Sequence, residues 1–103
     1  MPKTDIKTAI QEMQRVLKPH GLMFINFLTV HDFRCGSGED LGQNQYMQWD
    51  DDQKVIHAYF DEAEADHYIQ GMKILFKENR MIERYYQGQW IRQGFLDYIA
   101  QKK

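Results

Sequence analysis

The sequence has only one cysteine, Cys35, so no disulfide can form within the chain. It has no stretch near the roughly 18 apolar residues that a membrane helix needs. Its first residues lack the apolar segment of a signal peptide. We therefore expect no membrane partner and a reducing, cytoplasmic location.

Positive charge is also scarce, with 13 Lys and Arg against 15 Asp and Glu and a net charge of -2. A nucleic-acid-binding domain normally carries a basic patch, so we expect no nucleic-acid partner. The chain has 103 residues, of which 43% are hydrophobic. That length predicts a single domain, 1–103, with one core.

Spacings typical of metal sites are absent as well. His31 and Cys35 lie four residues apart, and His57 and His67 lie ten apart, which matches no zinc motif. The acidic run 50–52 lacks the alternating ligands of a calcium loop. We predict no metal site. Cys35 and His31 could instead act as a catalytic nucleophile and its general base, although nothing in the sequence orients the histidine.

What the sequence does contain begins with an amphipathic pattern. Apolar residues recur at helical spacing from Ile6 to Leu17, which predicts a helix capped by Thr4 or Asp5. Pro19 ends this helix, and Gly21 supplies an unusual backbone angle in the turn that follows.

The next segment, Leu22–Val30, is almost continuously apolar. This pattern is typical of a strand buried on both faces, as in parallel sheets flanked by helices. From His31 to Gln53 the sequence is rich in glycine, amides and acids, and we interpret it as a surface loop.

The second half of the chain predicts one more helix and a hairpin. Asp61 and Glu64 have the spacing of a capping box, so a helix runs from there to about Gln70. Val55–Tyr59 before it is either a short strand or an extended segment that leads to the helix. Met72–Tyr86 and the final apolar strand, Phe95–Ala100, form a long antiparallel hairpin.

This order of elements resembles the C-terminal half of a class I S-adenosylmethionine-dependent methyltransferase. Residues 11–27, QEMQRVLKPHGLMFINF, are similar to the family's helix ending in RVLKPGG and its fifth strand. His20 stands where many members carry the first glycine. Residues 57–83 and the final FLDYIAQKK resemble the segments that form the sixth and seventh strands.

The resemblance implies an α/β fold, a partial Rossmann-like sheet. It would have about three mixed strands with a C-terminal antiparallel hairpin, and two main helices. The last strand would lie between the other two and antiparallel to both.

The family cofactor is S-adenosylmethionine, but this chain lacks the glycine-rich loop and acidic residue that bind it. The short motif Gly36-Ser37-Gly38 follows the wrong strand. We therefore expect no cofactor-binding residues and no cofactor for the chain alone.

In the family, the segment after the fifth strand helps to shape the pocket for the methyl acceptor. By resemblance the substrate-binding candidates are His31, Phe33, Arg34, Tyr46, Trp49 and Tyr59. In the alternative interpretation, Tyr46, Trp49 and Tyr59 only cover the sheet edge. No catalytic residue can be identified from the sequence.

The function expected from the resemblance is methyl transfer to an unknown acceptor. The chain would be a C-terminal fragment of a longer enzyme, or a product that has lost its cofactor half, and inactive alone. The alternative is a non-catalytic binding or assembly module. Because the family's fourth strand is missing, Leu22–Val30 would have an open edge, and we expect a homodimer through that strand.

Overall fold

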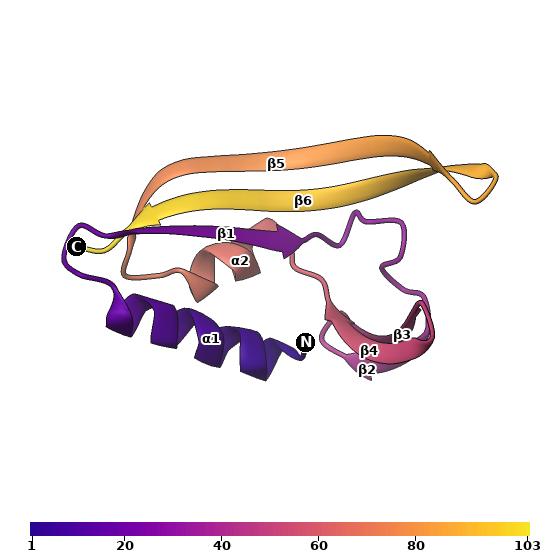
Figure 1. Ribbon diagram of the computed structural model, residues 1–103, viewed down its shortest axis with the longest axis horizontal. Helices are drawn as coiled ribbons and strands as arrows, with labels where there is room; N and C mark the ends of the chain where they lie inside the picture. Colours follow the sequence, from indigo (N-terminus) through magenta and orange to yellow (C-terminus); the bar gives the residue numbers. More distant parts are fainter.

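The computed structural model describes all 103 residues, which form two helices and two three-stranded sheets. About half of the residues lie in strands and a fifth in helices. The elements in chain order are α1 (Lys3–Val16), β1 (Leu22–Leu28), β2 (Glu39–Gly42), β3 (Gln45–Asp50), β4 (Gln53–Ala58), α2 (Glu62–Tyr68), β5 (Lys73–Tyr86) and β6 (Gln89–Gln101) (Figure 1). Neither helix is long and apolar enough to cross a membrane.

The larger sheet has the strand order β1-β6-β5, and both pairs of neighbours are antiparallel. The predicted C-terminal hairpin is confirmed as β5 and β6, which pair from Lys73 opposite Gln101 to Tyr86 opposite Gln89. The prediction that the last strand lies between the other two, antiparallel to both, is also confirmed.

The predicted fold class, a partial Rossmann-like α/β sheet, is wrong. A Rossmann-like sheet is built from parallel strands joined by helical crossovers, whereas every pair of neighbouring strands here is antiparallel. The parallel pairing in the chain is a single isolated bridge between Thr29 and Phe60. The molecule is mostly β, with two antiparallel sheets.

The predicted surface loop His31–Gln53 is wrong for most of its length. It contains β2, β3 and the start of β4, which form the second sheet as an antiparallel meander in the order β2-β3-β4. β2 is exposed along its whole length and β3 is only partly buried, and both sequences are rich in polar residues, so they lack the apolar alternation that usually identifies a strand. Of the two alternatives for Val55–Tyr59, the short strand is confirmed for Val55–Ala58, which lie in β4, whereas Tyr59 follows its end.

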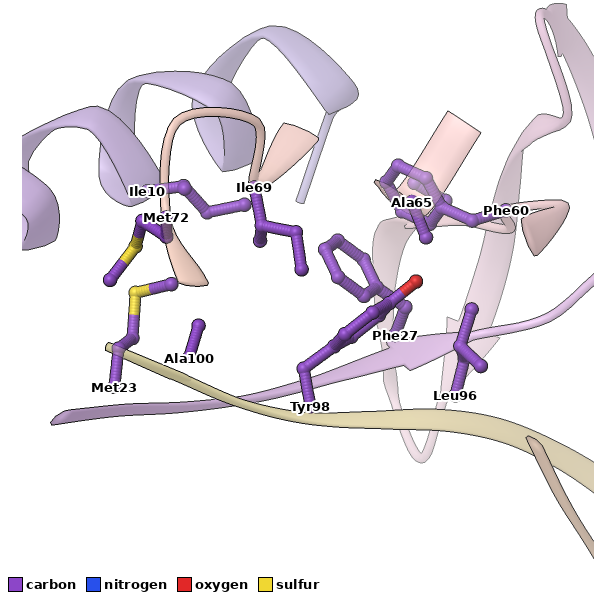
Figure 2. Close-up of a cluster of buried hydrophobic side chains, with 11 residues drawn as sticks. Ile10, Met23, Phe27, Phe60, Ala65, Ile69, Met72, Leu96, Tyr98 and Ala100 are labelled. Carbon is purple, nitrogen blue, oxygen red and sulfur yellow. The ribbon is translucent and has the colours of Figure 1, made fainter. Parts of the chain in front are cut away.

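Both helices pack on the same face of the larger sheet (Figure 1). Figure 2 shows side chains of α1, α2, β1 and β6 meeting in one cluster, with Phe27 and Tyr98 at its centre. The ring of Phe27 lies 4.7 Å from that of Phe60 and 5.8 Å from that of Tyr98, centre to centre. This cluster is the core of the protein.

The prediction that β1 is buried on both faces is wrong. Met23 and Phe27, which face the helices, are each 3% exposed, whereas Phe24 on the other face is 70% exposed. No element covers the second face over β1. The continuous apolar sequence of this strand therefore reflects one core face and one open apolar face.

The helix termini show which local predictions hold. α1 begins after Pro2 without a side-chain cap, so the predicted cap by Thr4 or Asp5 is wrong. In α2 the Asp61 carboxylate accepts a hydrogen bond from the Glu64 backbone N–H at 2.8 Å, which confirms the capping spacing.

In the turn before β1, the residue in the left-handed region is His20, with φ of 68°, and not Gly21 as predicted. Gly21 is needed for a different reason. A Cβ there would lie 2.9 Å from the Lys18 carbonyl oxygen.

Candidate ligand-binding cleft

A cleft of about 580 Å³ opens beyond the carboxyl end of β1, between the outer half of the β5–β6 hairpin and the second sheet. Figure 1 shows the hairpin running past the end of β1 to the region of the β2–β4 meander. Residues of both sheets and of the loop after β1 line the cleft; they are Leu28, Asp32, Phe33, Arg34, Trp49, Asp50, Asp51, His57, Tyr59, Arg84, Tyr86, Gln87, Ile91, Gln93 and Phe95.

The loop after β1 is held against β6. The Thr29 N–H donates to the Gly94 carbonyl at 3.0 Å, and the Phe33 N–H donates to the Arg92 carbonyl at 2.8 Å. The buried Asp32 carboxylate accepts from the Gly94 N–H at 2.9 Å. Position 94 requires glycine because a Cβ there would lie 2.2 Å from the Thr29 hydroxyl. This close approach holds Asp32 and Phe33 of the loop at the cleft, which both residues line.

A buried polar network holds the same loop to the second sheet. The Tyr59 hydroxyl donates to Gln48 Oε1 at 2.8 Å. Gln48 Nε2 in turn donates to the carbonyl oxygens of Arg34, at 2.8 Å, and Ser37, at 3.1 Å. Tyr59 and Gln48 are almost fully buried. Since the network is fully satisfied, it fixes the loop at a defined distance from β3.

Four of the predicted substrate-binding residues line this cleft: Phe33, Arg34, Trp49 and Tyr59. The other two do not. His31 is exposed outside the cleft, and the ring of Tyr46 lies beside that of Tyr59 with 6.1 Å between their centres. Whether the four residues contact a substrate stays a prediction, and the hydroxyl of Tyr59 is already used within the protein.

His57, on β4, is the imidazole of the cleft. Partial burial lowers its pKa, and the nearby positive charge of Arg34 lowers it further, partly offset by Asp50. A histidine normally titrates near pH 6.5, so this imidazole is mainly neutral at pH 7. It can accept a proton or a hydrogen bond from a ligand.

The sequence reasoning missed the contribution of the hairpin. Arg84 and Tyr86 of β5 and Phe95 of β6 line the cleft, as does His57. Alternating positions of a strand share a face, so the sequence does place Arg84 and Tyr86 together. The sequence does not show that the loop after β1 runs alongside β6, or that the face of β5 with Arg84 and Tyr86 therefore lies opposite the second sheet.

No protein-family model matches the sequence, and no curated protein matches it. The resemblance to methyltransferases therefore rests on the quoted motifs and their order.

The residues present do not fit S-adenosylmethionine. The family's glycine-rich loop brings backbone close to the ligand at a helix N-terminus, but Gly36-Ser37-Gly38 leads into β2. Both glycines adopt positive φ, and a Cβ on Gly38 would lie 2.2 Å from the Met47 carbonyl oxygen. Gly38 thus serves the packing of the loop against β3, and neither glycine opens a helix that could cradle a cofactor.

Neither Cys35 with His31 nor any cluster of metal-binding residues forms a second site. Burial and the nearby Asp32 raise the pKa of Cys35, the opposite of what activates a thiol nucleophile. Cys35 and His31 share no hydrogen bond. No group of three or more His, Cys, Asp or Glu residues is placed to hold a metal ion.

Proposed function

We propose that this chain provides the acceptor-binding side of an S-adenosylmethionine-dependent methyl-transfer site. The observation that supports this function is the cleft beyond β1, which is lined by Phe33, Arg34, Trp49 and Tyr59. These residues come from the segment that the resemblance associates with the acceptor. The cleft combines aromatic walls with charged groups, as sites for small organic molecules commonly do.

The turn before β1 gives independent support for the resemblance. His20 has φ of 68°, in the left-handed region that favours glycine. It stands where the methyltransferase motif carries glycine. A glycine would adopt this backbone conformation readily, which supports the correspondence of His20 with the glycine of the motif.

Since the chain has no fitting cofactor site, the cofactor side would come from residues outside 1–103. We predict that the chain alone does not bind S-adenosylmethionine appreciably. Calorimetric titration with the cofactor and its demethylated product checks this, with a complete methyltransferase as the positive control. Binding at micromolar concentration with unit stoichiometry would contradict it.

The acceptor function can be tested without the cofactor. The immobilised protein is incubated with a small-molecule extract of its source cells, and retained compounds are identified by mass spectrometry. We expect a retained compound whose counterpart with one added methyl group is present in the same extract. Protein carrying Trp49→Ala is the control. The function is rejected if the two proteins retain the same compounds, or if no methylated counterpart exists.

A second candidate is a non-catalytic module that assembles through β1. Along this strand the odd-numbered residues direct their backbone N–H and C=O groups toward β6, and the even-numbered residues direct theirs toward the outer edge. The Thr29 N–H donates to the Gly94 carbonyl, whereas the Leu28 carbonyl accepts from the Phe60 N–H on the outer edge. The backbone groups of Phe24 and Asn26 therefore point outward, and no strand pairs with them. An unpaired strand edge is a template for another chain. Either candidate function fits the cytoplasmic location expected from the sequence, which stays a prediction.

A further inference from the structure

The five arginines of the chain differ in whether they form ion pairs. Three pair with carboxylates: Arg15 with Glu12, Arg80 with Asp97, and Arg92 with Glu83. The other two, Arg34 and Arg84, form no ion pair, and both line the cleft. Guanidinium groups present planar forks of N–H donors that match carboxylate and phosphate oxygens.

Arg34 is held in place by the protein while most of its side-chain donors stay free. Its backbone N–H donates to the Asp32 carboxylate at 3.2 Å, and its carbonyl accepts from Gln48 at 2.8 Å. Its Nη2 donates to the Trp49 carbonyl at 2.7 Å. The guanidinium is thereby oriented at the cleft wall with donors left for a ligand.

Arg84 approaches the cleft from another element. It lies on β5, opposite the buried Ile91 of β6. Its guanidinium carbon is 5.2 Å from the centre of the Tyr86 ring. Stacking on this ring restricts the side chain without using its in-plane donors.

The carboxylates of the cleft do not neutralise these two arginines by direct contact. Asp32 is 6% exposed, and its two oxygens accept from the N–H groups of Gly94 and Arg34. Asp50 and Asp51 lie exposed at the turn between β3 and β4, and neither forms an ion pair. The cleft therefore holds two arginines without an ion pair, one carboxylate that is committed to backbone N–H groups, and two exposed carboxylates, Asp50 and Asp51, that contact neither arginine.

We infer that the cleft binds a planar organic anion, a carboxylate or phosphate ester, through Arg34 and Arg84. Its flat body would lie against the aromatic side chains of Trp49 and Tyr86. This inference rests on the proposed function and specifies it, since the methyl acceptor would then be an acid. His57, mainly neutral at pH 7, adds a hydrogen-bond acceptor beside the anion.

Four small probes test the charge preference: benzoate, phenyl phosphate, benzamide and benzylamine. Binding is followed through the backbone amide shifts of the ¹⁵N-labelled protein. We expect one or both anions to shift the amides of Arg34, Trp49 and Arg84, and to bind about tenfold more tightly than neutral benzamide. The tighter anion identifies the carboxylate or the phosphate ester as the ligand class. Equal binding of anions and benzamide, or tighter binding of benzylamine, would overturn the inference.

Three variants test the two arginines separately. Arg34→Gln and Arg84→Gln should each weaken binding of the preferred anion about tenfold, down to the level of benzamide. Arg92→Gln is the matched control, because Arg92 is an exposed hairpin arginine that pairs with Glu83 outside the cleft. Arg84 is also exposed, so its variant is expected to fold. Unchanged anion binding by Arg84→Gln would overturn the inference even if Arg34→Gln fails to fold.

The outcome is separable from that of the proposed function. If the anions bind as expected but no methylated counterpart of any retained compound exists, the ligand class stands and methyl transfer falls. If a neutral or cationic compound proves to be the methyl acceptor, the function stands and the anion inference falls.

Discussion

At position 20, a residue with a side chain occupies a conformation that favours glycine. His20 has φ of 68° and is exposed, and only its backbone groups bond to the rest of the chain. We predict that His20→Gly raises the free energy of unfolding by about 0.5–1 kcal/mol, because the left-handed conformation is unfavourable for residues with a Cβ. Urea denaturation followed by circular dichroism measures the change.

His31→Gly is the matched control for that substitution. His31 is also exposed, but its φ is not positive, so glycine relieves no strain there. Glycine only raises the conformational entropy of the unfolded chain, which lowers the free energy of unfolding. A stabilising effect at both positions, or at neither, would contradict the assignment of strain to His20.

The hydroxyl of Tyr59 is the donor that completes the buried network over β3. Tyr59→Phe leaves the buried Gln48 Oε1 without its partner. We predict a loss of about 1–2 kcal/mol in the free energy of unfolding, the usual cost of an unsatisfied buried acceptor. Urea denaturation measures it. Tyr46→Phe is the control, since that hydroxyl has no hydrogen bond in the structure, and its stability should match the wild type.

At the scale of elements, β1 carries phenylalanines with opposite surroundings. Phe27 is packed among Phe60, Tyr68 and Tyr98, whereas Phe24 is 70% exposed. We predict that Phe27→Ala costs about 3–5 kcal/mol, as large-to-small changes in a core do. Small domains are stable by only about 5–15 kcal/mol, so the thermal transition should fall steeply or disappear.

Phe24→Ala is the control in the same strand, and calorimetric melting compares the two variants. It should leave the melting temperature of the isolated chain nearly unchanged. Similar losses from both substitutions would mean that the open face of β1 is covered in solution.

The elements that the sequence predicted are those whose signal is local. The periodic apolar residues of α1, the Asp61 cap of α2 and the two strands of the hairpin all depend on residues close in the chain. The meander was missed because β2 is exposed along its whole length, and its pairing with β3 comes from backbone hydrogen bonds. The covering of β1 on one face also could not be predicted, since an apolar side chain does not reveal whether anything packs on it.

At the scale of the whole molecule, we predict a homodimer through the edge of β1. The proposed strand was Leu22–Val30, but Phe60 already bonds to Leu28 and Val30, so the open part of the edge is Leu22–Asn26. This part contains no charged residue and no proline, the features that usually block edge pairing. A two-fold axis at Phe24 would pair the strand with its copy and join two sheets into one.

Light scattering coupled to size exclusion measures the mass, and we expect a dimer at high micromolar concentration. Phe24→Pro should give a monomer, because it removes an outward N–H without touching the pairing of β1 with β6. Phe24→Ala loses the same side chain but keeps the N–H, so it isolates the contribution of the backbone. A wild-type chain that stays monomeric would refute the prediction.

How much of the cleft the sequence could predict also depends on distance along the chain. Phe33, Arg34, Trp49 and Tyr59 were identified from one continuous region that the resemblance links to the acceptor. The opposite wall comes from Arg84 and Tyr86, which follow that region in the chain, and depends on the hydrogen bond between the Phe33 N–H and the Arg92 carbonyl. A tertiary contact of this kind leaves no local pattern in either segment.

The sheet that contains this hairpin has three strands over one part of its length and two over the rest. β1 supports β6 only from Phe95 to Gln101, and the loop after β1 reaches as far as Arg92. From there to the turn at Gln87 and Gly88, no third strand pairs with the hairpin. Local opening will therefore begin at this turn and progress toward the core. Such fraying moves Arg84 and Tyr86 away from the cleft while the core around Phe27 stays packed. Amide hydrogen exchange in the outer hairpin therefore reports how often the cleft opens to a ligand.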